Sequence, residues 1–164
     1  MPILPIDTGR YGTPEMLSVF QEETRIQKLL DVEAALALAH GEVGNIPKKD
    51  AEKIFSMAST RYVKLERIKA IEKEIKHDLA SLVRALSEQC GPSSAYVHLG
   101  ATSYDIVDTA NALQLKEAFD VLEKKTENIL PHQLSPGIYL VVFKTGSSPL
   151  AMKFLVAGSG SGIR

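Results

Sequence analysis

A repeat of apolar residues at helical spacing runs through residues 74–89, EIKHDLASLVRALSEQ. The apolar positions fall at i, i+4, i+7, i+8 and i+11, which is one face of a helix. They are Ile75, Leu79, Leu82, Val83 and Leu86. The spacing predicts a helix over residues 74–89 with this face buried. It also places His77 about 200° away, on an accessible face with Ser81, Arg84 and Glu88.

Similar signals predict helices on both sides of this stretch. Thr13 and Pro14 are a helix-entry pair, so one helix is expected from about residue 14. Further helices are expected over residues 22–40, over 47–58 and from about 63. After Gly91 and Pro92, a helix of about 26 residues, or roughly 39 Å, is expected from Tyr104 to Ile129. Helices of this length are typical of extended bundles or coiled coils.

The character of the sequence changes after Leu130. Pro131, Pro136 and Pro149 interrupt the chain, which ends in a Gly-Ser alternation. Only residues 138–143 resemble a strand, and a single strand has no evident partner. We interpret this change as a truncation or frameshift of a longer chain, and we expect residues 131–164 to be irregular.

The expected fold class is mainly α. An N-terminal helical domain occupies residues 1–100 and leads into a long bundle helix that starts in residues 101–130, before the atypical tail of residues 131–164. With 164 residues and 45% hydrophobic residues, the chain can build one core.

Composition excludes several classes of function. The formal net charge is -1, with 19 basic and 20 acidic residues, so no basic face favours nucleic acid. No apolar run approaches the roughly 18 residues of a membrane span. Cys90 is the only cysteine, and the start MPILPIDTGR has no secretory pattern, so a cytoplasmic protein is expected. The isolated histidines and the single cysteine predict no metal site.

Three groups of residues could take part in chemistry. Lys76, His77 and Asp78 could form a cationic donor, an acid or base and an orienting carboxylate, although a histidine on an accessible helix face is more often a solvated surface residue. Arg10 and Tyr11 offer guanidinium and phenol donors that suit a phosphate, although such a pair is often incidental.

The third group is HLGATSYD, residues 98–105. Thr102 stands three residues before Asp105, which is the spacing of a capping box. The same hydroxyls of Thr102 and Ser103 stand beside free amides at the positive end of a long helix, where a carboxylate can bind. Gly100 would let a ligand approach the backbone.

Five motifs in order resemble the N-terminal region of the adenylosuccinate lyase family, in the fumarase/aspartase superfamily. The resemblance covers about residues 6–130. The motifs are RYGTPEM at 10–16, LLDVEAALALA at 29–39, GNIPKKDA at 44–51, EKEIKHDL at 72–79 and HLGATSYDIVDTA at 98–110.

The resemblance implies a helical subunit of a homotetramer. Its reaction would be a β-elimination of fumarate from adenylosuccinate, giving AMP, and from the succinyl-carboxamide ribotide SAICAR, giving AICAR, with no cofactor. His77 would be catalytic, Lys76 and Asp78 would line the nucleotide and leaving-nitrogen side, and Arg10 and Tyr11 would hold the phosphate. Thr102 and Ser103 would hold a succinyl carboxylate, so that the helix start and the anion site use the same atoms.

The sequence also departs from the family. Lys76 stands where the family usually has arginine, which keeps the charge and loses the planar fork. The second histidine segment and the mobile serine loop of the family are not present, so we expect this chain alone to be inactive. The alternatives are a non-catalytic helical oligomerisation fragment and another superfamily lyase such as argininosuccinate lyase. Arg10 and Tyr11 argue against argininosuccinate lyase, because a substrate without phosphate would give this pair nothing to bind.

Overall fold

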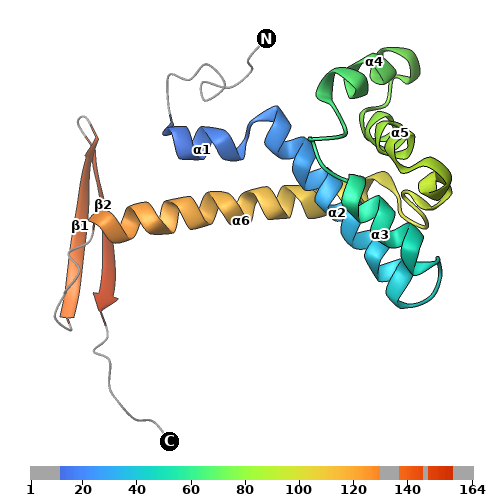
Figure 1. The fold of residues 1–164 in the computed structure, drawn as a ribbon. Coiled ribbons are helices and arrows are strands. Elements are labelled where there is room, and N and C mark those ends of the chain that lie inside the picture. Colours follow the sequence, from blue (N-terminus) through green and yellow to red (C-terminus); the bar gives the residue numbers. More distant parts are fainter. Residues whose placement is uncertain (1–11, 130–136, 146–147, 157–164) are drawn as a thin grey trace, which may run out of the picture. The chain divides into compact units, whose positions relative to one another are not determined.

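The computed structural model describes residues 12–129, 137–145 and 148–156 (Figure 1). These residues belong to two compact units, of which the first ends at Val121 and the second begins at Leu122. The first unit is helical throughout its regular structure, and the second contains the end of the last helix and two strands.

The first three helices begin where the sequence predicts. α1 (Pro14–Val19) follows Thr13, whose side chain accepts a hydrogen bond from the Met16 N–H at 3.5 Å. α2 (Glu22–Glu42) and α3 (Lys48–Met57) lie side by side. A Cβ at Gly41 of α2 would lie 2.7 Å from the Ala51 Cβ of α3, so only glycine permits this close approach.

The predicted helix over residues 74–89 is two helices. α4 (Leu65–Ile75) ends at Lys76, which has a left-handed backbone with φ 56°, and α5 (Asp78–Cys90) begins after His77. Ile75 therefore belongs to α4 and is 39% exposed, while Val83 is half-buried. Ser81, predicted to be accessible, is fully buried together with Ala85, so the buried arc of α5 is wider than the predicted apolar face.

A 3-10 turn connects α5 to the last helix. This turn, η2 (Gly91–Tyr96), follows the positive φ of Gly91, at 57°. α6 (Ser103–Ile129) has 27 residues and confirms the predicted long helix. Between them, residues 97–102 form a short connection with positive φ at His98 and Gly100.

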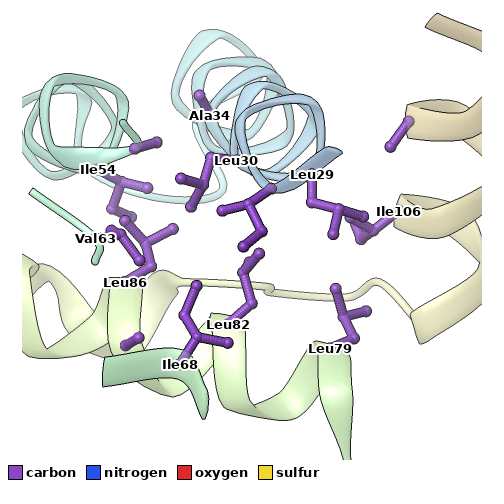
Figure 2. Close-up of a cluster of buried hydrophobic side chains, with 14 of the residues drawn as sticks. Leu29, Leu30, Ala34, Ile54, Val63, Ile68, Leu79, Leu82, Leu86 and Ile106 are labelled. Carbon is purple, nitrogen blue, oxygen red and sulfur yellow. The ribbon is translucent and has the colours of Figure 1, made fainter. Parts of the chain in front are cut away.

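The core lies among α2, α3, α4, α5 and the first turns of α6 (Figure 2). Leu30, Ile54 and Leu86 are fully buried and point toward one another from three helices. Leu79 and Leu82 of α5 face Leu29 of α2, so the predicted apolar face of α5 is confirmed at these positions. Ile106 joins the core from α6 and thereby fixes the start of that helix.

Shortening Leu82 to alanine tests this packing. Leu82 is 2% exposed, so Leu82→Ala should lower the free energy of unfolding by about 2–5 kcal/mol through lost apolar contact and a residual cavity. Phe55→Ala is the control, because Phe55 is 56% exposed and its loss should cost less than about 0.5 kcal/mol. Denaturant unfolding of both variants gives the values. If both variants lost equally little unfolding free energy, Leu82 would not be a core residue.

Two described segments of the tail, which was predicted to be irregular, form strands. β1 (Gly137–Thr145) pairs antiparallel with β2 (Ser148–Val156), with Ile138 opposite Leu155 and Thr145 opposite Ser148. Pro149 made the second strand hard to predict, yet each strand of a two-stranded sheet is an edge, where proline is tolerated.

The mainly α fold class is confirmed by the helical unit. The predicted domain divisions at residues 100 and 130 stay a prediction. Within the described ranges, no helix is both long and apolar enough to cross a membrane.

Candidate active site

His77 lies at the junction of α4 and α5, as the N-cap residue of α5. Its Nδ1 accepts a hydrogen bond from the Ala80 N–H at 3.2 Å, and its side chain is 51% exposed. Because Nδ1 is the acceptor, the proton of the neutral ring is on Nε2. His77 is thus an accessible histidine with an Nε2–H donor.

The two neighbours of His77 do not form the arrangement that the sequence suggested. Asp78 Oδ1 accepts from the Leu79 N–H at 2.7 Å and lies 3.6 Å from His77 Nδ1, which is beyond hydrogen-bond distance. The Ala80 amide, and not the Asp78 carboxylate, therefore orients the ring. Lys76 borders a separate hollow with Lys69 and Lys73.

The capping carboxylate predicted at the start of α6 is present. Asp105 Oδ2 accepts from the Thr102 N–H at 2.8 Å, as the acidic residue of a capping box does. This bond uses the amide that precedes the helix. The amides of Ser103 and Tyr104 belong to the first turn, which has no intrahelical acceptors and carries the positive end of the helix dipole.

The starts of α5 and α6 line one cleft, which consists of two adjoining hollows. A hollow of about 420 Å³ is bordered by His77, Asp78, Thr102, Ser103, Tyr104 and Val107. A second hollow of about 380 Å³ shares His77 and Ser103 with the first and adds His98. Four of the seven residues predicted from the sequence, His77, Asp78, Thr102 and Ser103, therefore border the same cleft.

Two residues of this region were missed as site residues. His98 borders the cleft, and its Nδ1 lies 2.6 Å from Oε1 of Glu33, whose side chain is fully buried. Burial raises the pKa of the Glu33 carboxyl, and the hydrogen bond and charge of His98 act in the opposite direction. Glu33 could have been found as a charged residue inside the apolar repeat of α2.

The sequence also raised a phosphate-binding pair, a metal site and the single cysteine. Arg10 and Tyr11 lie outside the described residues. In the part of the chain that the structure describes, no group of three His, Cys, Asp or Glu residues could hold a metal ion. Cys90 is 1% exposed, and burial raises the pKa of its thiol to about 11, with Lys53 lowering it slightly.

Cys90 should therefore be unreactive in the folded protein, because the thiolate is the nucleophilic form. Iodoacetamide at about pH 8, where a free thiol of pKa near 8.5 is partly ionised, should leave the native chain unmodified. The same chain unfolded in guanidinium should be alkylated at one position. Rapid modification of the native chain, measured by mass spectrometry, would contradict the buried position.

Comparison with known proteins identifies the family. A family model described as lyase matches residues 9–132. The chain belongs to this lyase family. The lyase chain is 56% identical over 129 residues to the adenylosuccinate lyase of Pyrococcus abyssi, which covers 79% of the chain and 28% of that relative. It thus spans little more than a quarter of the relative's length.

Two other relatives extend the comparison. The lyase chain is 42% identical over 118 residues to N-acetyl-S-(2-succino)cysteine lyase of Dickeya dadantii, covering 72% of the chain and 26% of the relative. Its fold resembles a fumarate lyase from Mesorhizobium sp. BNC1, with a TM-score of 0.65 and 30% identity over 73% of the chain and 29% of that structure. The resemblance predicted from the sequence motifs is confirmed at the level of the family.

Proposed function

We propose that this chain supplies part of the active site of an adenylosuccinate lyase. The reaction is the β-elimination of fumarate from adenylosuccinate to AMP, and from SAICAR to AICAR, in purine biosynthesis in the cytoplasm. The observation that carries the proposal is the 56% identity to the Pyrococcus abyssi enzyme across the segments that bring His77 and Ser103 to one cleft.

β-Elimination needs three things from a protein: a base for the carbon-bound proton, a proton donor at the departing nitrogen, and donors that hold the carboxylate as it gains charge. His77 suits the second task, because its Nδ1 is occupied by the Ala80 N–H and its Nε2–H is the donor. Lys76 and Asp78 are proposed on the nucleotide side, and Arg10 and Tyr11 at the phosphate. The reaction itself requires no metal or redox cofactor.

Thr102 and Ser103 suit the third task. They stand at the first turn of a 27-residue helix, whose free amides and dipole favour an anion. The cap is already made by Asp105 through the Thr102 N–H, so the Ser103 hydroxyl and amide stay available for a carboxylate. The side chain of Asp108 is exposed, outside the residues that border the cleft.

We also propose that the protein assembles as a homo-oligomer, with a tetramer expected for the complete enzyme. The support is an apolar pair on α6, in which Leu115 is 53% and Phe119 66% exposed. These two residues stand at i and i+4, the spacing of one helix face. Burying such a face against other helices is the usual way in which a long helix is stabilised.

A chimera tests the proposed function. Residues 9–130 of this chain, joined to the remaining sequence of the Pyrococcus abyssi lyase, should release fumarate from adenylosuccinate, as followed by absorbance. The chain alone should not, because groups that act as a unit leave little activity when part is absent. A folded but inactive chimera, or turnover of about 1 per second by the chain alone, would contradict the proposal.

A second substrate distinguishes the nearest alternative. The Dickeya dadantii relative is named for a 2-succino compound, so a carboxylate site at the α6 start would suit both substrates. If the chimera released fumarate only from N-acetyl-S-(2-succino)cysteine, the succinyl side of the site would stand and the nucleotide assignment would fail.

A further inference from the structure

A carboxylate buried in the helical core connects to the cleft through one histidine. Glu33 lies on α2 between the core residues Leu30 and Ala34, and its side chain is fully buried. Its Oε1 is 2.6 Å from His98 Nδ1, while its Oε2 has no hydrogen-bond partner among the residues that the structure describes. Burying a carboxylate carries a desolvation cost that an apolar residue of similar size would avoid, so packing does not account for Glu33.

His98 is held in an unusual position. Its backbone has φ 61°, a left-handed conformation that is unfavourable for a non-glycine residue. The next residue is also fixed, because His40 Nε2 lies 2.9 Å from the Leu99 carbonyl oxygen and Asn45 Nδ2 lies 2.9 Å from His40 Nδ1. Asn45 donates to Nδ1, so Nε2–H of His40 donates to Leu99.

The ring of His98 therefore spans from the core to the cleft. Its side chain is 21% exposed, and it borders the hollow that His77 and Ser103 share. Glu33 occupies Nδ1, so Nε2 is the nitrogen left for the cleft. His77 is arranged in the opposite way, since its Nδ1 accepts from the backbone.

We propose that Glu33 is a positioning residue of the site, which holds His98 by an Nδ1–H···Oε1 hydrogen bond and turns its Nε2 toward the cleft. A partner on one ring nitrogen fixes both the tautomer and the orientation of a histidine. The cleft then contains two fixed histidines: Nε2 is a donor in neutral His77 and an acceptor in neutral His98. The proposal rests on the proposed function only in taking this cleft as the site.

The test uses the chain itself, without any reaction. Histidine rings labelled with ¹⁵N report which nitrogen carries a proton in long-range ¹H–¹⁵N spectra, measured at about pH 8, above the usual histidine range. Single replacements of His40, His77, His98 and His132 assign the signals. We expect a protonated Nδ1 in His98, whether the ring is neutral or charged, and a protonated Nε2 with bare Nδ1 in His77.

Two variants at Glu33 separate positioning from packing. Glu33→Leu keeps the volume and removes the acceptor, so His98 should lose its fixed Nδ1–H signal and show averaged or Nε2–H shifts. Glu33→Gln keeps an amide oxygen as acceptor and should retain the Nδ1–H signal. Circular dichroism checks that both variants fold.

Two results would overturn the proposal: a neutral His98 with bare Nδ1 in the unmodified chain, or an unchanged Nδ1–H signal in folded Glu33→Leu. If Glu33→Leu does not fold, the unmodified chain still decides. None of these outcomes depends on the substrate, so the lyase assay can fail while the positioning of His98 holds, and the reverse.

Discussion

Replacing Ser103 by alanine in the chimera should lower kcat/KM for adenylosuccinate by about 10- to 1000-fold, by analogy with the loss of one donor to a developing oxyanion. Ser103 stands at the first position of α6 and borders the cleft with His77. The capping bond is made by Asp105 and the Thr102 N–H, so it survives the substitution. Stability should therefore change by less than about 0.5 kcal/mol.

Thr109→Ala is the matched control, because it removes a hydroxyl from an exposed site on the same helix. The Thr109 Oγ1 donates to the Asp105 carbonyl oxygen and borders neither hollow. Ser81, which the sequence placed beside His77 on an accessible face, is unsuitable, since its buried hydroxyl donates to the His77 carbonyl at 2.5 Å. Near-normal kinetics in folded Ser103→Ala would mean that HLGATSYD only starts the helix and does not bind a carboxylate.

Replacing His98 by alanine should destabilise this chain by about 3–5 kcal/mol, because the buried Glu33 carboxylate loses its partner. The loss should depend on pH. Without His98, burial alone acts on Glu33 and raises its pKa further. A carboxyl whose pKa is raised by folding stabilises the fold below the unfolded value of about 4.3 and loses that stability as pH rises. The deficit should thus be larger at neutral pH than in acid.

The double variant Glu33→Gln/His98→Ala isolates the cost of leaving a buried Glu33 carboxylate without its partner. An amide is easier to bury than a charge, so the cost of losing His98 should be smaller in the Glu33→Gln background. Urea unfolding of the four proteins gives the coupling energy. Additive losses, or a deficit that does not grow with pH, would mean that Glu33 is not held as a partner of His98.

Periodicity predicted the helices well and missed the break between α4 and α5. The apolar positions Leu79 and Leu82 continue the phase of Ile75 in sequence, and neither glycine nor asparagine marks the left-handed residue. Lys76 adopts φ 56° because the packing of α4 and α5 on the core over-determines it. Local helix propensity cannot predict a constraint that comes from tertiary packing. The N-cap role of His77 depends on the same break, because α5 begins directly after it.

The pair of Glu33 and His98 joins residues far apart in the chain, so spacing alone could not reveal it. The sequence did show each residue separately: Glu33 is an acidic residue at a core position of α2, and His98 is the first residue of the motif HLGATSYD. The strand partner of residues 138–143 was missed for a similar reason. Pairing depends on the register of two segments, and Pro149 and Lys153 obscured the second one.

The most direct test is a crystal structure of the chimera with AMP and fumarate bound. The central claim predicts one fumarate carboxylate at hydrogen-bond distance, about 2.7–3.2 Å, from the hydroxyl or amide of Ser103, with His77 Nε2 on the side of the AMP nitrogen. Fumarate bound elsewhere, with the α6 start and His77 facing only solvent, would contradict the claim that this cleft is the lyase site.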